Sequence, residues 1–382
     1  MSLTAVEEAP KIRVLSVFGT RPEAAKMCPL VLELQNHPRF ESMVCVTAQH
    51  REMLDQVLHI FGVVPDYDLD IMKPNQTLSG ITTRILEKIE PVLRESKPDL
   101  VLVHGDTTTS FAVALAAFYQ QIPVGHVEAG LRTYNMYSPF PEEMNRVLTG
   151  RLATLHFAPT SLNRANLVRE NILEKIFITG NTVLDAFKTT VRENYSFKNT
   201  ILQKLDLNKG RYILMTAHRR ENIGPPLEAI CHAVLRLVKE FDDVKILYPV
   251  HPNPAIHDPV HKMLGHQARI YLLDPLELTD LHNLMAKCHL VLTDSGGLQE
   301  EGPSFKKPVL VLRTETERPE AVEAGCVKVI GVKEDAIVEE VRAVLTQEEI
   351  YQSFLKNPNP YGDGSASRKI INAILGWKEP LI

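Results

Sequence analysis

The stretch LVLVHGDTTTSFAVALAAFYQQIPVGHVEAG, residues 100–130, decides the fold class of this chain. It begins with the short apolar run Leu100–Val103, continues through the helix-forming segment Thr108–Tyr119, and ends in a second apolar run, Val124–Val127. Strand-like runs that alternate with longer helical segments are typical of parallel strands joined by crossover helices. The stretch therefore predicts a βαβ unit with polar residues directly after each strand.

The same alternation extends through both halves of the chain and predicts an α/β protein. Further strands are expected at Arg13–Val17, Met43–Thr47, Leu155–Ala158, Tyr212–Thr216, Lys245–Pro249, Ile270–Leu272, Leu290–Thr293, Val309–Leu312 and Val327–Ile330. The halves repeat one architecture without visible sequence repetition, which indicates two doubly wound, Rossmann-like domains that face each other across a central cleft. We expect an N-terminal domain at 1–180, a C-terminal domain at 181–362 and a final helix within 363–382.

The composition excludes several classes of protein. Hydrophobic residues make up 44% and charged residues 23% of the 382 residues, which is typical of a soluble globular chain. A net charge of −5 gives no general attraction to nucleic acid or to an anionic membrane. The five cysteines are scattered and form no Cys-x-x-Cys pair, so we expect neither disulfides nor a zinc knuckle. No window approaches the roughly 20 apolar residues of a membrane span, and the expected location is the cytoplasm.

A first candidate anion site is the motif Gly19-Thr20-Arg21-Pro22-Glu23, which follows a strand and opens a helix. Unpaired backbone N–H groups at such a helix start attract anions, and Lys26 follows one turn later. An ordinary strand-to-helix connection with a solvated arginine explains the same pattern. The chain has no Gly-Lys-Ser/Thr sequence, so this is not a Walker loop.

Carboxylates at three neighbouring connections form a candidate catalytic cluster. Asp106 and Glu128 follow two strands at the end where open α/β sheets bind ligands, and Glu142 starts the next helix. Each alone has a structural explanation: Asp106 can cap the helix at Thr108, Glu128 can pair with Arg132, and Glu142 suits the helix dipole. Three together predict a convergent acidic cluster suited to general acid–base catalysis.

The second half supplies groups suited to a diphosphate. His218 to Asn222 follow one predicted strand, and Asp294-Ser295-Gly296-Gly297-Leu298-Gln299-Glu300-Glu301 follow another. The glycines permit close approach of the backbone, while Ser295 and the helix start can donate hydrogen bonds to phosphate. Glu301, one turn into the helix, is placed to accept hydrogen bonds from a ribose. Most Ser-Gly-Gly sequences form ordinary turns without a ligand, so this motif supports a diphosphate site only together with the other motifs.

The second half also contains two arginines near its predicted phosphate-binding loop and most of the histidines of the chain. Arg313 and Arg318 can neutralise phosphate, although arginines beside glutamates often form plain surface pairs. The histidines show no His-x-x-x-His pair with a companion glutamate, which argues against a metal site. Four of them are expected at the surface: His257, His261, His266 and His282.

Taken in order, these motifs resemble those of the non-hydrolysing bacterial UDP-N-acetylglucosamine 2-epimerases, from about Lys11 to Trp377. The resemblance implies two Rossmann-like domains of the glycosyltransferase-B type, a final helix that returns to the first domain, and a homodimer. It implies interconversion of UDP-GlcNAc and UDP-ManNAc without a cofactor, and no nucleic-acid or membrane partner. The product would feed cell-surface polysaccharide synthesis.

The resemblance also assigns roles to residues of this chain. The implied catalytic residues are Asp106, Glu128, Glu142 and His218. The implied substrate contacts are Arg21, Lys26, Arg146, Ser295, Gly296, Gly297, Glu301 and Arg318. A second, regulatory UDP-GlcNAc site is implied at Gln49, His50, Gln76, Arg219 and His251. Asn75 departs from the arginine found in some regulated members.

The chemistry follows from the absence of a nicotinamide-binding fingerprint in the sequence. The proton on carbon 2 is only weakly acidic, so departure of UDP from the neighbouring anomeric carbon is needed to acidify it. This predicts anti elimination to 2-acetamidoglucal, followed by re-addition of UDP. The alternatives are a hydrolysing epimerase, which would release UDP and free ManNAc, a UDP-sugar glycosyltransferase, which would need an acceptor, and a non-catalytic nucleotide-sugar sensor.

Overall fold

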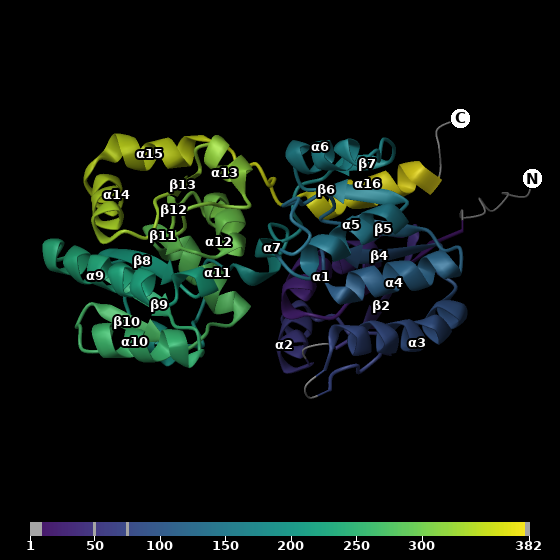
Figure 1. Cartoon of the computed structure of the whole chain (residues 1–382), viewed down its shortest axis with the longest axis horizontal. Helices are drawn as coiled ribbons and strands as arrows, with labels where there is room; N and C mark the ends of the chain where they lie inside the picture. Colours follow the sequence, from purple (N-terminus) through teal and green to yellow (C-terminus); the bar gives the residue numbers. More distant parts are fainter. Residues whose placement is uncertain (1–9, 49–50, 74–75, 379–382) are drawn as a thin grey trace, which may run out of the picture. The chain divides into compact units, whose positions relative to one another are not determined.

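The computed structural model describes residues 10–48, 51–73 and 76–378, which form two compact units. Unit 1 takes its residues from Met1–Ala186 and Gly364–Ile382, and unit 2 is Phe187–Asp363. The chain therefore leaves unit 1 for unit 2 once and returns for its last helix. Both units are parallel sheets whose strands are joined by helices (Figure 1).

Unit 1 contains a seven-stranded parallel sheet in the order β3-β2-β1-β4-β5-β6-β7. The strands are β1 (Ile12–Phe18), β2 (Phe40–Val46), β3 (Tyr67–Asp68), β4 (Leu100–His104), β5 (Val124–Val127), β6 (Leu155–Ala158) and β7 (Ile176–Ile178). The helices are α1 (Arg21–Gln35), α2 (Arg51–Phe61), α3 (Leu78–Ser96), α4 (Thr108–Tyr119), α5 (Glu142–Leu152), α6 (Ser161–Arg169) and α16 (Ala366–Lys378). The central strands are buried on both faces, as parallel strands under crossover helices must be.

Unit 2 contains a six-stranded parallel sheet in the order β10-β9-β8-β11-β12-β13. The strands are β8 (Arg211–Thr216), β9 (Val244–Pro249), β10 (Ile270–Leu273), β11 (Leu290–Thr293), β12 (Val309–Val311) and β13 (Val327–Val329). The helices are α7 (Phe187–Thr190), α8 (Thr200–Gln203), α9 (Pro225–Glu240), α10 (Pro254–Leu264), α11 (Leu278–Lys287), α12 (Gly296–Glu301), α13 (Pro319–Glu323), α14 (Glu334–Thr346) and α15 (Glu348–Lys356), with 3-10 turns η1 (Arg220–Asn222) and η2 (Gly302–Phe305).

The strand order reverses direction once in each unit, and this sets where ligands bind. In unit 1 the reversal lies between β1 and β4, and in unit 2 it lies between β8 and β11. Open parallel sheets bind ligands at the carboxyl ends of the strands at such a switch point. The loops that leave these four strands carry the motifs around Arg21, Asp106, His218 and Ser295.

The final helix α16 belongs to unit 1, where Figure 1 shows it in yellow among earlier elements. It packs against α1. Its first backbone N–H groups, those of Ala366 and Ser367, donate to the two carboxylate oxygens of buried Asp185, each over 3.1 Å. Asp185 thus satisfies N–H groups that have no partner within the helix.

The predicted α/β class and all the predicted strands are confirmed, with ends that differ by a few residues. The short edge strands β3 and β7 and the helices α7, α8 and α15 were not predicted. Both strands lie at the edges of the sheet, where a single neighbour supports them and the apolar run is short. In the described ranges, no helix is both long and apolar enough to cross a membrane.

Candidate active site

Glu128 directly follows β5 and adopts a positive φ of 60°, which is unfavourable for a residue with a side chain. Its Oε2 accepts hydrogen bonds from Lys26 Nζ and, over 2.8 Å, from Asn181 Nδ2. His104 Nε2 lies 3.7 Å from the same oxygen. The alternative that Glu128 pairs with Arg132 is wrong, because Arg132 Nε lies 2.6 Å from Glu170 instead. The carboxylate is therefore fixed in a polar cage at the end of the strand, and strain of this kind is typical of functional positions.

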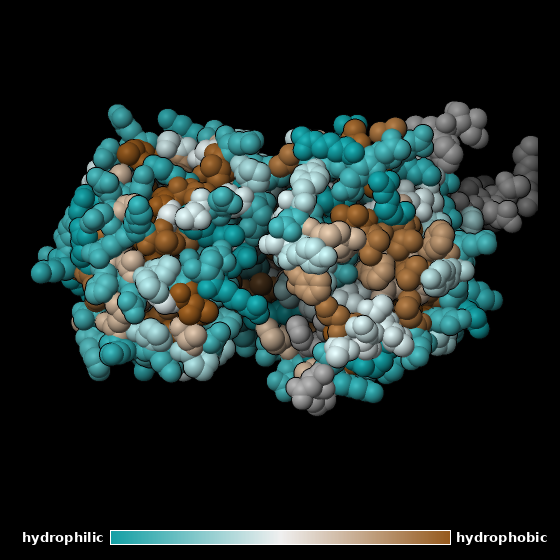
Figure 2. Space-filling model, in the orientation of Figure 1, coloured by the Kyte–Doolittle hydropathy of each residue, from teal (hydrophilic) through white to brown (hydrophobic). Residues whose placement is uncertain are grey.

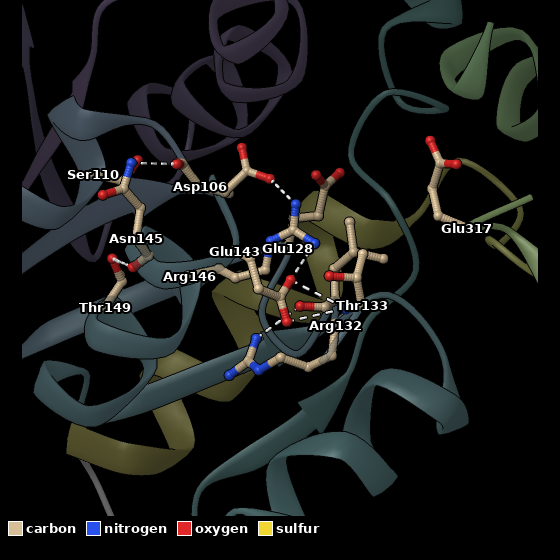
Figure 3. Close-up of polar contacts among 12 residues, drawn as sticks. Asp106, Ser110, Glu128, Arg132, Thr133, Glu143, Asn145, Arg146, Thr149 and Glu317 are labelled. Atoms are coloured by element: carbon tan, nitrogen blue, oxygen red, sulfur yellow. Dashed lines mark hydrogen bonds and ion pairs between the residues drawn. The ribbon is translucent and has the colours of Figure 1, made fainter. Parts of the chain in front are cut away.

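Asp106, after β4, is held by α5. Asp106 Oδ2 lies 2.5 Å from Arg146 Nη2, and Arg146 Nη1 lies 3.2 Å from Glu143 Oε2. Asn145 Nδ2 donates to the backbone carbonyl of Asp106 over 3.0 Å. Figure 3 shows the guanidinium of Arg146 between the two carboxylates. The alternative that Asp106 caps α4 is wrong, because Thr107 is the capping residue and its hydroxyl accepts Ser110 N–H.

The two glutamates at the start of α5 differ in their surroundings. Glu143 is buried, and its carboxylate accepts the N–H groups of Thr133 and Tyr134 as well as facing Arg146. Glu142 is half-buried, and within the described residues its carboxylate has no hydrogen bond or ion pair. The predicted catalytic residue Glu142 is thus the carboxylate of the pair left available to a ligand. The structure pairs Asp106 and Glu128 with cations rather than with each other.

Glu23 joins the loop after β1 to the loop after β4. Its Oε2 accepts Gly19 N–H and Thr20 N–H, and its Oε1 accepts the Thr107 hydroxyl over 2.7 Å. This buried carboxylate also completes a capping box with Thr20 and so fixes the start of α1 at Arg21. Gly19 has no space for a side chain, because a Cβ there would lie 1.8 Å from Thr47 Oγ1.

In unit 2, His218 follows β8 and is held by Asp294, which follows β11. Asp294 is fully buried; its Oδ2 accepts the N–H groups of His218 and Arg219 over 2.7 and 2.8 Å, and Asn222 Nδ2 donates to it over 3.0 Å. The ring of His218 stacks on His251 with centroids 5.8 Å apart. Burial lowers the pKa of His218, while the charge of Asp294 acts in the opposite direction.

The loop 295–297 at the start of α12 faces a group of arginines. A Cβ placed on Gly296 would lie 3.3 Å from Glu317 Oε1 and 3.4 Å from Arg219 Nη2, so a larger residue would have to displace these side chains slightly. Glu317 Oε1 lies 3.1 Å from Arg219, and its Oε2 lies 2.5 Å from Arg313. Although burial alone raises it, the pKa of Glu317 falls to about 2 because Arg318, Arg219 and Arg313 surround the carboxylate.

Arg318 pairs with buried Glu300, so it is fixed rather than a solvated surface residue. Glu301 has a partner that was not expected, because its Oε2 lies 3.4 Å from His282 Nε2. The prediction that His282 lies at the surface is wrong: its side chain is fully buried between α7 and α12, whereas His257, His261 and His266 are exposed as expected. Helical periodicity offered a signal for this, because His282 lies with Leu278 and Met285 on the buried face of α11.

The residues expected to bind a regulatory ligand are only partly described. Gln49 and His50 lie outside the described residues, as does Asn75. Gln76 accepts a hydrogen bond from Arg84 over 2.6 Å in unit 1, while Arg219 and His251 belong to unit 2. Across the described ranges, no group of three or more His, Cys, Asp or Glu residues is arranged to hold a metal ion.

Sequence reasoning missed three side chains that hold the predicted ones: Glu23, Glu143 and Asp294. Each is an acidic residue inside a motif in which a nearby residue was predicted to act: Arg21, Glu142 and Ser295, respectively. A signal existed only for Glu23, since Thr20 followed three residues later by a glutamate is the capping-box pattern. Nothing in the pattern separates Glu143 from Glu142, because only burial distinguishes them.

Two Rossmann-like units with polar loops at both switch points define an α/β protein of the glycosyltransferase-B type. The family model described as UDP-N-acetylglucosamine 2-epimerase matches residues 32–375. The chain belongs to the UDP-N-acetylglucosamine 2-epimerase family, and the expected likeness to its non-hydrolysing bacterial members is confirmed.

Three similar proteins illustrate the extent of the likeness. The UDP-N-acetylglucosamine 2-epimerase of Bacillus subtilis is 55% identical over 96% of this chain and 95% of its own length. That of Escherichia coli K12 is 55% identical over 95% of this chain and 98% of its own. The crystal structure of the Neisseria meningitidis UDP-GlcNAc 2-epimerase bound to UDP-GlcNAc is 50% identical, with a TM-score of 0.86 over 95% of this chain and 100% of that one.

Proposed function

We propose that this chain interconverts UDP-GlcNAc and UDP-ManNAc by inverting carbon 2 of the sugar. The observation that carries the proposal is the pair of carboxylates Asp106 and Glu128 at the ends of neighbouring strands, each held by a cation. A carboxylate held in place keeps its direction while a proton moves, which is what general acid–base catalysis requires. The UDP-GlcNAc bound to the Neisseria meningitidis relative supports the choice of substrate.

The reaction proceeds by elimination and re-addition. A base removes the proton from carbon 2 while the bond from carbon 1 to UDP breaks with its electron pair going to the diphosphate oxygen. The products of this half-reaction are 2-acetamidoglucal and UDP. Re-addition of UDP to carbon 1, with protonation of carbon 2 from the opposite face, gives the epimer. The steps balance without an oxidant or a reductant.

The residues divide between proton transfer and leaving-group binding. Asp106, Glu128 and Glu142 exchange protons with carbon 2, and Lys26 and Arg146 orient the first two. The departing diphosphate is held by donors that need no reorganisation, which is the most effective way to stabilise developing charge. We assign this role to Arg21, His218, Ser295, Gly296, Gly297 and Arg318, with Glu301 on the ribose.

Heavy water tests the function directly. The protein is incubated with UDP-GlcNAc alone in D2O, and the sugar protons are followed by NMR. Deuterium at carbon 2 of a UDP-linked product supports epimerisation by proton removal. Release of UDP and free ManNAc as the main products would identify a hydrolysing epimerase. No exchange at carbon 2, with release of UDP only when an acceptor sugar is added, would identify a glycosyltransferase, and either result defeats the proposal.

We further propose that the protein is a homodimer. Hydrophobic residues gather on one face of unit 1 (Figure 2). In this unit Phe118 and Tyr119, at the end of α4, are exposed, as are Tyr137 and Phe140. Exposed apolar surface of this kind marks an interaction site, and a second copy of the chain would cover it. Sedimentation of the protein and of a Phe118→Lys variant tests this: a monomeric wild type defeats the proposal, and a monomeric variant supports it.

The remaining proposals concern regulation and place. A second UDP-GlcNAc would regulate turnover through Gln49, His50, Gln76, Arg219 and His251. Sigmoidal dependence of the initial rate on UDP-GlcNAc that becomes hyperbolic in Gln76→Ala supports this site, and a hyperbolic wild type defeats it. All five cysteines are buried free thiols, which suits the reducing cytoplasm as the place of reaction. The product would feed cell-surface polysaccharide synthesis.

A further inference from the structure

The buried side chain of His282, on α11, forms the middle of a chain of three polar residues in unit 2. Its Nδ1 lies 2.7 Å from the hydroxyl of Thr190 in α7. The ring is packed edge to face against Phe187, with centroids 4.8 Å apart at 85°. The ring is therefore held on one side by a hydroxyl and on its face by an aromatic residue.

Asn283, the residue after His282 on α11, fixes the position of Thr190, which belongs to α7. Asn283 Nδ2 donates to the Thr190 carbonyl over 2.7 Å, and Asn283 Oδ1 accepts Arg192 N–H over 3.0 Å. Two hydrogen bonds from one amide set the register of the α7 segment against the helix. These contacts hold the Thr190 hydroxyl next to the imidazole of His282.

The other nitrogen of His282 faces Glu301. Nε2 and Glu301 Oε2 are 3.4 Å apart, with side chains that are 0% and 12% exposed. Neither atom has a hydrogen-bond partner among the described residues. A buried polar atom without a partner costs about 1–3 kcal/mol, so an N–H directed at a carboxylate is the arrangement that offsets both costs. When the Thr190 hydroxyl donates to Nδ1, the neutral ring carries its proton on Nε2, as this arrangement needs.

The second oxygen of Glu301 lies beside Gly297, which is exposed. Glu301 Oε1 lies 3.5 Å from the point where a Cβ of Gly297 would be, and Ser295 Oγ lies 3.8 Å from the same point. Gly297 has no side chain at this point. One carboxylate oxygen therefore faces His282, while the other is presented beside a bare backbone and a hydroxyl.

We propose that His282, anchored by Thr190, is a positioning residue that fixes Glu301 to accept the ribose hydroxyls of the uridine nucleotide and so selects ribose over deoxyribose. The assignment rests on the proposed function, because it takes the ligand to be a UDP-sugar. A carboxylate whose direction is fixed in advance loses less conformational freedom on binding and discriminates more sharply against a sugar that lacks a hydroxyl.

The test uses three variants and one control in the full chain. His282→Phe removes the nitrogen but keeps the ring beside Phe187, His282→Gln returns an N–H near the Nε2 position, and Thr190→Val removes only the hydroxyl. His289→Phe is the control, since His289 stacks on Tyr351 with centroids 4.6 Å apart and has no part in the site. For each variant, kcat and KM are measured with UDP-GlcNAc and with its 2′-deoxyuridine analogue, and the Kd of UDP is measured by calorimetry.

We expect His282→Phe to raise KM and the Kd of UDP about tenfold, as loss of a hydrogen bond to a charged group does, with kcat little changed. The preference for UDP-GlcNAc over the 2′-deoxy analogue falls in parallel. His282→Gln recovers most of both, Thr190→Val gives a smaller change in the same direction, and His289→Phe matches wild type. Combining His282→Phe with Glu301→Gln adds little to Glu301→Gln alone.

Other results overturn the assignment. An unchanged Kd and an unchanged preference in His282→Phe, or a fall in kcat alone, would show that the histidine serves only packing. If His282→Phe does not fold, His282→Gln and Thr190→Val decide by the same two measurements. The Kd of UDP needs no turnover, so a wild type that binds UDP but does not epimerise UDP-GlcNAc would defeat the proposed function while this assignment is still judged by binding.

Discussion

Asp294 holds His218 by two different oxygens: Oδ2 accepts the His218 backbone N–H over 2.7 Å, and Oδ1 lies 3.2 Å from the ring nitrogen Nδ1. The first contact fixes the main chain after β8, and the second places a carboxylate oxygen beside the ring. A carboxylate beside Nδ1 favours the tautomer with its proton there, which leaves Nε2 free to accept a proton. The pair thus sets the backbone position of His218 and favours one nitrogen of its ring as the acceptor.

Replacing Asp294 with asparagine should therefore lower turnover without unfolding the protein. The amide oxygen can take over the backbone N–H groups, but its NH2 then faces Nδ1 and favours the opposite tautomer. We expect kcat to fall about 100-fold, within the usual range for acid–base groups. Since the charge of Asp294 raises the pKa of His218, the limb of the pH–rate profile that reports this histidine should move to lower pH.

Asp280→Asn is the matched control for this change. Asp280 is also buried in unit 2, and its carboxylate accepts the Tyr195 hydroxyl and the Lys198 and Asn199 N–H groups. It should cost stability without moving the pH–rate profile. Equal profiles for both variants and wild type would show that Asp294 only braces the loop.

The adjacent pair Glu142 and Glu143 gives a second test of the proposed site. Glu142→Gln should abolish most turnover while leaving the unfolding midpoint unchanged, because its carboxylate has no partner in the described part of unit 1. Glu143→Gln should cost about 2 kcal/mol of unfolding free energy, since it removes the charge opposite Arg146. Each variant is the control for the other, measured by kcat and by urea unfolding. The reverse pattern would transfer the catalytic role to Glu143.

The fold was predictable because the sequence repeats one physical pattern. Runs such as Leu100–Val103 are too short for helices and are apolar throughout, as strands covered on both faces must be. The same pattern placed Asp106 and Glu128 at strand ends, where the structure has them. Strand order is not written in any local pattern, so the switch points at β1/β4 and β8/β11 required the structure.

The partners of the site residues were less predictable than the residues themselves. The sequence offered Arg132, four residues away, as an alternative partner of Glu128, but its cationic partner Lys26 lies on α1. Asp106 pairs with Arg146 on α5. Such pairs join elements far apart in sequence, so the spacing of residues along the chain does not predict them. His282 was misplaced for a different reason: its spacing from Leu278 and Met285 indicates the buried face of α11, but exposure was predicted from its polar side chain.

The pair Lys26 and Glu128 should contribute to stability as well as to catalysis. Their side chains are 15% and 11% exposed, so Lys26→Met leaves a largely buried carboxylate without its cation. We expect a loss of about 3 kcal/mol of unfolding free energy, the lower end for a broken buried pair. The single tryptophan, Trp377, lies in α16 of unit 1 and reports the unfolding of this unit by fluorescence.

The double variant Lys26→Met with Glu128→Gln separates the two roles. Removing the second charge removes the cost of the unpaired carboxylate, so stability should return most of the way to that of wild type. Epimerisation should stay absent, because neither the carboxylate nor its cation is present. A double variant as unstable as Lys26→Met alone would mean that Lys26 stabilises unit 1 by packing rather than by charge.

Two buried histidines should make unit 1 less stable as the pH falls below neutrality. Burial is the largest cause of both pKa shifts: it lowers the pKa of His126 to about 3 and that of His156 to about 4. An unfolded chain protonates both near the ordinary value of about 6.5, whereas the folded unit keeps them neutral. Unit 1 therefore has its full free energy of unfolding above about pH 6.5. As the pH falls below that value, each histidine lowers this free energy by up to about 1.4 kcal/mol per pH unit.

His156→Phe should remove about half of the histidine-dependent loss between pH 7 and pH 5, measured by Trp377 fluorescence in urea. Parallel pH curves for the variant and wild type would show that His156 is protonated equally in the folded and unfolded states.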